Sequence, residues 1–419
     1  MSGGWTPEDA ERHLGSLELF GMRFGLDRMR RLTSALGRPQ DSFSSVHVVG
    51  TNGKSSTVRM TAAILAEHGV RAGAYLSPHL LAWAERVRVG DADLEPSAFA
   101  AAVQRTARAA ALVDRTGPAE DRVTQFELIT AAAFLALAEQ GVEVAVIEAG
   151  LGGRHDATNV IPSSVSVLTN VGLEHTRWLG PTLLDIAREK LAVVREKSTL
   201  VVGPLSPEVA EEAGRTALAR DAALVRAPAD PGASVGAAGA FQRANFALAR
   251  AAAQAHIGEL ELELGAVRAA AAAVRIPGRL EAVDARPLTL LDGAHNPAGA
   301  AALSSALFEL ANGREIVAVL SVLDDKDAAG MLGELLPGCA ATVLTRAGNP
   351  RALPPGTLES LARQVCGTQA PPLHVEPDPL RALALARGLA GRDGVVVATG
   401  SIYLVADLVR PSGAGAAQV

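Results

Sequence analysis

Short apolar runs of strand length alternate with longer segments of helical periodicity along almost the whole chain. In the first part we expect strands at Val46–Val49, Ala72–Leu76, Val144–Glu148, Val165–Thr169 and Thr199–Val202. Helices are expected between them, for example over Ser55–His68 and Phe126–Glu139, where apolar residues recur at helical spacing. This alternation predicts an α/β fold with a mostly parallel sheet that is flanked by helices on both faces.

The pattern is interrupted around Ile276–Asp284, where Pro277-Gly278-Arg279 follows an alanine-rich helical segment. A second alternating series comes after it, with expected strands at Leu288–Leu291, Ile316–Leu320, Ala341–Leu344, Leu373–Val375 and Val395–Ala398. We therefore expect a first domain over residues 1–280 and a smaller, Rossmann-like α/β domain over residues 287–410. The Gly/Ala-rich tail, residues 411–419, has a composition typical of disorder.

Composition narrows the choice of partners. A chain of 419 residues exceeds what one hydrophobic core commonly fills, which agrees with two domains. The net charge is −6 and no basic run occurs, so nucleic acid and anionic membranes are not expected as partners. The N-terminal segment is acidic and has no apolar leader, so we expect a soluble, cytoplasmic protein. Cys339 and Cys366 have no metal-binding spacing and are interpreted as reduced thiols.

The segment Val46–Thr57, VHVVGTNGKSST, has the layout of a phosphate-binding loop. An apolar run ends at Gly50, and a short loop leads into an expected helix whose first backbone N–H groups and dipole favour an anion. Lys54 can reach the outer phosphates of a nucleotide, and a hydroxyl that follows it can hold Mg²⁺. The candidate ATP contacts in this loop are Thr51, Asn52, Gly53, Lys54, Ser55 and Ser56.

This loop is a variant of the common motif. The full G-x-x-x-x-G-K-[ST] spacing needs glycine where the chain has His47. An ordinary glycine turn between a strand and a helix is the alternative interpretation, but the strand and helix on either side favour phosphate binding.

Three polar residues lie at or just after the ends of other expected strands. They are Ser77, Glu148 and His175. Because ligands of open α/β sheets bind at the carboxyl ends of the strands, these side chains could complete a Mg²⁺ site beside the loop. Taken singly, each has a simpler interpretation: a turn residue, a helix cap and a histidine satisfied by neighbouring polar groups.

Lys190 lies in the expected helix Leu183–Val194. From the pattern alone, a solvated lysine paired with Glu189 or Asp185 is the simpler interpretation. Arg279 closes the Pro-Gly-Arg turn at the proposed hinge, where its guanidinium could meet a phosphate or could simply belong to a linker.

The second domain has two polar loops at strand ends. Asp292-Gly293-Ala294-His295-Asn296-Pro297 follows an expected buried strand, and a position at a strand end suggests contact with a ligand such as the ribose of the nucleotide. Asp325-Lys326-Asp327 occupies a comparable loop, where a solvated charge run is equally compatible with the sequence.

Taken together, these segments resemble the folylpolyglutamate synthase and dihydrofolate synthase family, a branch of the Mur ligase superfamily. The resemblance covers essentially the whole chain from GMRFGLDRM near Gly21. It is carried, in order, by VVGTNGKSST, SPHL with ERVRV, TQFE, IEAGLGGRHDATN, GLEHT with LGPTLLDIAREK, PGR, LDGAHNP, DDKD, NPRAL and ATGSIYL.

The resemblance implies an ATP-dependent ligase that joins L-glutamate to dihydropteroate or to the γ-carboxylate of reduced folates, and that releases ADP and phosphate. Phosphorylation turns a poor acyl donor into an acyl phosphate that an amine attacks, while positioning and charge neutralisation supply most of the catalysis. In the family, closure of the smaller domain is expected to exclude water. The implied protein is a cytoplasmic monomer whose partners are small molecules.

The resemblance also assigns roles to individual positions. Ser77, Glu148 and His175 match magnesium ligands, and Lys190 matches a carbamylated lysine whose carbamate binds a second Mg²⁺. Carbamylation needs a neutral amine, so Lys190 is then expected in a desolvated site. The implied catalytic groups are Lys54, Lys190, His175 and Arg279; the further ATP contacts are Asn245, Arg279, Asp292 and His295. The acceptor positions are Thr124, Gln125, Phe126, Glu127, Asp156 and Ala157, and Phe24–Arg28 resembles a further pterin-side segment.

Three departures from the family pattern concern the loop and the acceptor pocket. Ser55 replaces a common glycine after the loop lysine, so either Ser55 or Ser56 could be the metal-binding hydroxyl. His155 replaces a common leucine, and Phe241 replaces a common histidine. Another Mur-type ligase that acts on a cell-wall nucleotide precursor and a catalytically silent ATP-binding regulator are the competing hypotheses. The motifs do not separate the two folate activities from one another.

Overall fold

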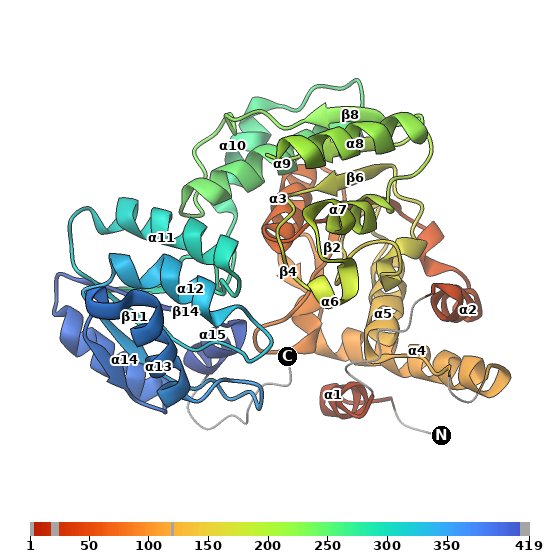
Figure 1. The fold of residues 1–419 in the computed structure, drawn as a ribbon. Coiled ribbons are helices and arrows are strands. Elements are labelled where there is room, and N and C mark those ends of the chain that lie inside the picture. Colours follow the sequence, from red (N-terminus) through yellow and green to blue (C-terminus); the bar gives the residue numbers. More distant parts are fainter. Residues whose placement is uncertain (1–3, 18–24, 119–120, 411–419) are drawn as a thin grey trace. The chain divides into compact units, whose positions relative to one another are not determined.

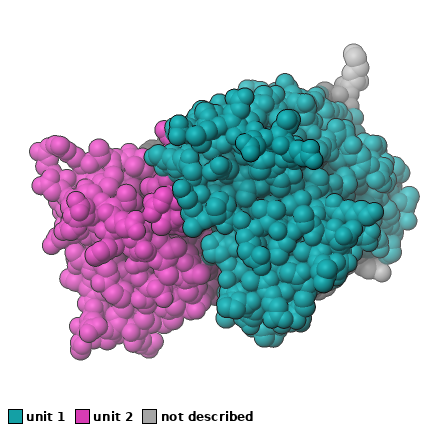
Figure 2. Space-filling model, turned by 90° about the horizontal axis from the view of Figure 1, so that it is seen from above, with its two compact units in different colours: residues 1–235, 244–274 teal, residues 236–243, 275–419 magenta. Residues whose placement is uncertain are grey.

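The structure is a computed structural model that describes residues 4–17, 25–118 and 121–410. They divide into two compact units, which Figure 2 distinguishes by colour: unit 1 has residues 1–235 and 244–274, and unit 2 has residues 236–243 and 275–419. The chain passes between them after Val235, again within helix α9 (Ala240–Ile257), and a third time after Val274. The domain limits at residues 280 and 287 stay a prediction. The proposed disordered tail, 411–419, and Phe24 of the pterin-side segment lie outside the described residues.

Unit 1 is built on a mostly parallel sheet of eight strands among the described residues. In spatial order they are β4 (Ala92–Asp93), β3 (Val87–Val89), β2 (Ala72–Tyr75), β5 (Val144–Glu148), β1 (Ser44–Val49), β6 (Val165–Leu168), β7 (Thr199–Val202) and β8 (Ala223–Arg226). The strands predicted in this part are all present. The sequence missed β3 and β4, which form an antiparallel extension next to β2, and β8, because these strands are short and partly exposed.

Helices flank this sheet (Figure 1). The α-helices of unit 1 are α1 (Pro7–Gly15), α2 (Asp27–Ala35), α3 (Lys54–Glu67), α4 (Pro96–Thr116), α5 (Gln125–Glu139), α6 (Thr176–Leu179), α7 (Leu183–Leu191), α8 (Pro207–Ala219), the greater part of α9, and α10 (Leu264–Ala273). Single 3-10 turns lie at η1 (Pro39–Asp41), η2 (Trp83–Arg86) and η3 (Ala157–Val160). No described helix is long and apolar enough to cross a membrane.

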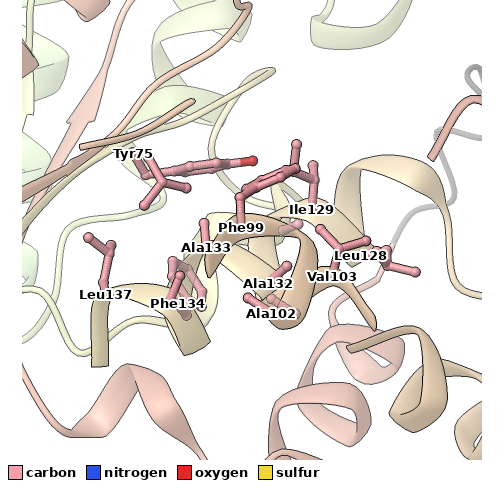
Figure 3. Close-up of a cluster of buried hydrophobic side chains, with 14 of the residues drawn as sticks. Tyr75, Phe99, Ala102, Val103, Leu128, Ile129, Ala132, Ala133, Phe134 and Leu137 are labelled. Atoms are coloured by element: carbon pink, nitrogen blue, oxygen red, sulfur yellow. The ribbon is translucent and has the colours of Figure 1, made fainter. Parts of the chain in front are cut away.

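A large buried cluster lies where α4 and α5 pack beside β2 (Figure 3). Tyr75 meets Phe134 edge-on, with ring centroids 6.5 Å apart, and its hydroxyl lies 3.0 Å from Thr130 Oγ1. Burial raises the pKa of Tyr75 to about 12. Alanines of α5, such as Ala132 and Ala133, let the helices approach closely, which explains how a core with few aromatic residues is filled.

Unit 2 contains a second, smaller parallel sheet with one antiparallel edge. Its strand order is β13 (Leu373–Val375), β12 (Ala341–Leu344), β11 (Ile316–Leu320), β14 (Val395–Thr399), β10 (Leu288–Leu291) and β9 (Glu281–Ala285). Its helices are α11 (Pro297–Ala311), α12 (Ala328–Leu335), α13 (Pro355–Cys366), α14 (Pro379–Ala390) and α15 (Ile402–Val409), with 3-10 turns η4 (Leu336–Gly338) and η5 (Gly367–Gln369). The five predicted strands are present. The interruption expected around Ile276–Asp284 contains most of β9, an exposed edge strand whose sequence lacks apolar alternation.

Candidate functional site

The candidate residues of unit 1 come from four neighbouring strands. β2, β5, β1 and β6 are adjacent in the sheet and run parallel. Their carboxyl ends therefore meet at one edge. Ser77 follows β2, Glu148 ends β5, the phosphate loop follows β1, and His175 comes after β6. The interpretation of these residues as one group is thus compatible with the topology.

The phosphate loop turns into α3 at Gly53, whose φ of 82° is in the left-handed region. A Cβ at this glycine would lie 2.4 Å from Asn245 Oδ1, so the loop approaches Asn245 too closely for any side chain. Lys54 Nζ donates to the Thr51 carbonyl at 3.0 Å. The first backbone N–H groups of α3 follow Gly53 and have no partner within the helix. Asn245, which the resemblance assigns to ATP, lies against Gly53 at this end of the helix.

Glu148 is the acidic centre of the site and is buried. Its Oε1 accepts a hydrogen bond from Ser55 Oγ at 3.0 Å, and its Oε2 accepts one from the Ser77 backbone N–H at 3.2 Å. Ser56, in contrast, is 3% exposed. The structure thereby brings together three predicted residues from β5, the loop and the segment after β2, and it identifies Ser55 as the hydroxyl that faces the carboxylate.

A segment that the sequence analysis did not single out holds the loop. Thr169, Asn170 and Gly172 follow β6 and make six hydrogen bonds with Thr51 and Asn52. The backbone N–H groups of Thr51 and Asn52 and the Asn52 carbonyl thereby find their hydrogen-bond partners at the end of the neighbouring strand β6. The available signal was the polar pair Thr169-Asn170 at the end of the expected strand Val165–Thr169, to which no role was assigned.

His175 has a left-handed backbone, with φ of 53°, at the start of the single-turn helix α6. Its Nε2 lies 3.9 Å from Glu174 Oε1. The backbone of His175 accepts N–H groups of Trp178 and Leu179, at 2.8 and 3.0 Å, which orders the turn. The structure therefore places an imidazole and a carboxylate together in the loop after β6.

Lys190 is buried, and the solvated interpretation is wrong. Its Nζ donates to the Gly50 carbonyl at 2.7 Å, directly before the phosphate loop. Glu189 pairs instead with Arg154, with Arg154 Nε 2.8 Å from Glu189 Oε1. Burial, together with the nearby charge of Lys54, lowers the pKa of Lys190 to about 7. A substantial neutral fraction of this amine exists near neutral pH.

The TQFE segment begins α5 and its polar groups are engaged. Thr124 caps the helix: its Oγ1 accepts the Glu127 N–H at 3.3 Å and donates to Glu127 Oε2 at 3.0 Å. Glu127 also accepts Arg28 Nε at 3.1 Å, in a buried ion pair. Gln125 Nε2 donates to the Leu14 carbonyl at 2.8 Å. These contacts organise α5, and they leave any contact of these three residues with an acceptor a prediction.

The glycine-rich segment after β5 folds around Asp156. This buried carboxylate accepts the N–H of Leu151 at 2.7 Å and that of Thr158 at 3.0 Å, and its pKa is raised by burial. The Thr158 hydroxyl also donates to Asp156 and accepts from His47 Nε2 at 2.8 Å. Burial lowers the pKa of His47 to about 3, so this histidine is neutral and belongs to the strand.

Phe126 and Ala157 border the same segment. A Cβ at Gly150 would lie 2.4 Å from Phe126 Cζ, so the ring packs on the backbone just after β5. Ala157 is buried at the start of η3. Three of the assigned acceptor positions, Phe126, Asp156 and Ala157, thus lie at the one loop that follows Glu148.

Unit 2 has its own polar turn at a strand end. Asp292 follows β10 and is buried; its carboxylate accepts the N–H groups of Leu280 and Ala294, at 2.9 and 2.8 Å. Burial raises the pKa of Asp292, and Arg279 partly opposes this rise. Arg279 Nη1 donates to the Gly278 carbonyl at 3.0 Å, and His295 Nδ1 lies 2.8 Å from the Gly293 carbonyl. Arg279 is thus part of a folded turn of unit 2 beside Asp292.

The loop after β11 is structured as well. Asp325 pairs with Arg351, with Arg351 Nη1 3.3 Å from Asp325 Oδ1, and the Lys326 side chain is only 12% exposed. Asp327 caps α12 by accepting the Gly330 N–H at 2.9 Å. Asp325 and Asp327 are nevertheless exposed, so a solvated charge run stays compatible with the structure, and a ligand contact by Asp325–Asp327 stays a prediction.

The donor set suits a magnesium ion. Within the described part of the chain, no three His, Cys, Asp or Glu side chains form a metal cage by themselves. Mg²⁺ prefers oxygen ligands and is commonly bound by one or two carboxylates together with waters and phosphates. Glu148, with the hydroxyl of Ser55 beside it, fits that pattern.

Comparison with known proteins gives two family matches that cover most of the chain. Residues 48–214 match the family described as Mur ligase middle domain, and residues 278–402 match that described as Mur ligase, glutamate ligase domain. The first match contains the phosphate loop, Glu148, His175 and Lys190. The second contains Arg279, Asp292 and His295.

Two relatives carry the same description, dihydrofolate synthase/folylpolyglutamate synthase. The Mycobacterium tuberculosis protein is 36% identical over 78% of this chain and 75% of its own length. The Bacillus subtilis protein is 31% identical over 96% of this chain and 98% of its own length.

Solved structures agree with these relatives. The M. tuberculosis folylpolyglutamate synthase complexed with ADP superposes with a TM-score of 0.90 at 32% identity, covering 97% of this chain and 98% of its own. E. coli FolC in complex with DHPP and ADP has a TM-score of 0.83 at 27% identity, with 96% of each chain covered. A Yersinia pestis bifunctional synthase complexed with AMPPNP and a Mn ion has a TM-score of 0.82 at 28% identity, covering 96% of this chain and 97% of its own.

Proposed function

This chain belongs to the dihydrofolate synthase/folylpolyglutamate synthase family of Mur ligases, and from that membership we propose that it joins L-glutamate to dihydropteroate or to the γ-carboxylate of reduced folates, at the expense of ATP. The acceptor carboxylate takes the γ-phosphate and becomes an acyl phosphate. The glutamate amine then attacks the acyl carbon, an amide bond forms, and phosphate leaves while ADP is released. The residues of this sequence that match the family's motifs are the ones to which we assign contacts with ATP and with the acceptor.

The group formed by Lys54, Ser55 and Glu148 is the observation that carries the proposal. Lys54 stands at the start of α3, where positive charge and helix N–H groups favour the phosphates of ATP. The Ser55 hydroxyl donates to the Glu148 carboxylate. This bond places two oxygen ligands beside the loop, where a cation would neutralise the phosphates. Of the two candidate hydroxyls, we assign the metal-side role to Ser55.

Magnesium is the implied ion, and when bound it neutralises charge on the phosphates. Glu148, Ser77 and His175 are the residues that would hold it. Asn245, which lies against Gly53, is positioned to contact the nucleotide from α9. Phe126, Asp156 and Ala157 would contact the acceptor, while Thr124, Gln125 and Glu127 support α5 through the bonds described above. In unit 2, Arg279, Asp292 and His295 are assigned to ATP.

Carbamylation of Lys190 is the finer part of this proposal. The neutral amine attacks CO₂ and loses a proton, and the resulting carbamate would hold a second Mg²⁺. Burial and the lowered pKa of about 7 favour the neutral amine that this reaction requires. Intact-mass measurement in bicarbonate buffer tests the step: a gain of one CO₂ in the native protein, absent from Lys190→Arg, supports it. No gain under these conditions would contradict it.

A side-by-side assay tests the function itself. The protein is supplied with ATP, Mg²⁺ and glutamate, and with either dihydropteroate or tetrahydrofolate, and ADP release is followed. We expect acceptor-dependent ADP release with at least one of the two. Protein that binds ATP but turns over neither acceptor would contradict the proposal, and turnover with a UDP-linked cell-wall precursor would favour another Mur-type ligase. The assay also decides between one folate activity and both. A cytoplasmic location and a monomeric state stay predictions.

A further inference from the structure

The side-chain amide of Asn170 takes the place of a strand partner for the phosphate loop. Its Oδ1 accepts the Asn52 N–H at 2.9 Å, and its Nδ2 donates to the Asn52 carbonyl at 3.1 Å. The Asn170 backbone carbonyl accepts the Thr51 N–H at 3.0 Å. Asn170, just after the end of β6, therefore bonds to the N–H groups of Thr51 and Asn52 and to the Asn52 carbonyl.

Neighbours of Asn170 reinforce this attachment. Thr169 Oγ1 donates to the same Asn52 carbonyl at 2.6 Å, and the Thr51 hydroxyl bonds to both backbone groups of Gly172, at 3.0 and 3.3 Å. The approach is too close for a side chain at Gly50, where a Cβ would lie 1.8 Å from Thr169 Oγ1. The loop and residues 169–172 are therefore held as one body.

These bonds decide which donors remain for a phosphate. The Asn52 N–H is already satisfied by Asn170, so the cradle for the anion consists of the N–H groups that open α3 after Gly53. Three residues beyond Gly172 the same segment carries His175, the proposed metal ligand. A shift of this segment would thus move the phosphate cradle and the imidazole together.

We propose that Asn170 is a positioning residue that fixes the phosphate loop to the segment carrying His175 and thereby couples nucleotide binding to metal binding. The coupling to metal rests on the proposed function, since the role of His175 comes from it. Asn170 acts through Asn52, since both ends of its side-chain amide bond to the Asn52 backbone. Its loss removes the side-chain acceptor of the Asn52 N–H and one of the donors to the Asn52 carbonyl, which allows the cradle to adopt several conformations.

The test compares Asn170→Ala with Gln254→Ala, which also removes a side-chain amide that bonds to backbone groups in unit 1. Gln254 donates to the carbonyls of Gly258 and Leu260 and accepts the Leu262 N–H. For Asn170→Ala we expect the KM for MgATP to rise about 10- to 100-fold and the KM for the folate acceptor to stay within about twofold. Gln254→Ala should change neither constant.

Calorimetric ADP titrations, with and without Mg²⁺, give a readout that does not need turnover. We expect Mg²⁺ to tighten ADP binding less in Asn170→Ala than in the unaltered protein. Equal effects in Asn170→Ala and Gln254→Ala, or unchanged nucleotide constants in Asn170→Ala, would overturn the inference. A protein that binds ADP but lacks ligase activity contradicts the proposed function alone, and the binding comparison still tests Asn170.

Thr169→Val serves if Asn170→Ala does not fold. It keeps the volume of the side chain and removes only the bond from Thr169 Oγ1 to the Asn52 carbonyl. A smaller rise in the KM for MgATP, of about three- to tenfold, is expected, again with the acceptor constant unchanged. An unchanged KM for MgATP in this variant would contradict the inference.

Discussion

The turns after β1 in unit 1 and after β10 in unit 2 occupy equivalent places at strand ends, but they are held differently. Partners of the β1 turn come from distant parts of the chain, namely residues 169–172 and Lys190. The Asp292 side chain of the β10 turn bonds to residues within about a dozen positions, since it accepts the N–H groups of Leu280 and Ala294, while the Asp292 N–H donates to the distant Ala398 carbonyl of β14. The side-chain bonds of the first turn therefore depend on the assembly of the whole sheet, whereas those of the second are local.

The largest expected difference between these turns is catalytic. Lys54→Met should lower kcat/KM by about 10³-fold or more, because under the proposed function it removes the charge that neutralises the phosphates. His295→Ala, in the turn of unit 2, should lower it by about 10- to 100-fold, because one of the nucleotide contacts proposed for this unit is lost. ADP release is the measurement, with Lys197→Met, at an exposed position of unit 1, as the control. Equal losses at Lys54 and His295 would mean that the two turns contribute alike.

The next difference concerns Lys190, whose buried amine lies beside the β1 turn. The folded-state pKa of Lys190 is about 7, below its ordinary value of 10.5, so the unfolded chain binds more protons between these two values. Stability should therefore rise as the pH increases from about 7 towards 10, by up to roughly 4 kcal/mol.

Lys190→Met should remove this rise. The measurement is the urea midpoint between pH 6.5 and 9.5, taken in CO₂-free buffer as the difference between the original chain and the variant, so that other titrating groups cancel. Lys197→Met is the control for loss of a lysine charge at the surface. A difference that does not vary with pH would show that Lys190 is not desolvated in the folded protein.

Two glycines test whether the turns differ in rigidity. A Cβ at Gly50 would meet Thr169 Oγ1 at 1.8 Å, and Thr169 is held in place by its bond to Asn52. A Cβ at Gly293 would meet Arg279 Nη1 at 2.2 Å and Ile402 Cδ1 at 2.8 Å, both at the ends of flexible side chains. Gly50→Ala should therefore cost about 1–3 kcal/mol of unfolding free energy, and Gly293→Ala less than about 1 kcal/mol. Similar urea midpoints for the two variants would remove this contrast.

The same contrast explains what the sequence could predict. Most strands of both sheets and the β10 turn were accessible, because apolar runs and local polar clusters determine them. The phosphate loop was recognisable for the same reason. The attachment of the loop to Thr169 and Asn170, and the burial of Lys190, depend on which strands become neighbours. Helical periodicity places Lys190 on an amphipathic helix and cannot show that its amine reaches the carbonyl of Gly50. The exposed strand β9 was missed because its residues carry no burial pattern.

The smallest expected effects concern the caps of two helices, α5 in unit 1 and α11 in unit 2, which begin at candidate site residues. Thr124 caps α5 through a reciprocal pair with Glu127, and Asn296 caps α11 by accepting the Gly299 N–H at 2.8 Å. Thr124→Ala should cost about 1–2 kcal/mol, since buried Glu127 loses a donor, and Asn296→Ala should cost about 1 kcal/mol. Thr124→Ser and Asn296→Ser should restore most of each loss, as measured by urea unfolding. If Thr124→Ala instead left stability unchanged but raised the KM for the acceptor, the Thr124 hydroxyl would contact the substrate and would not act as a helix cap. The polar start of α5 would then be part of the binding site, as is proposed for the phosphate loop.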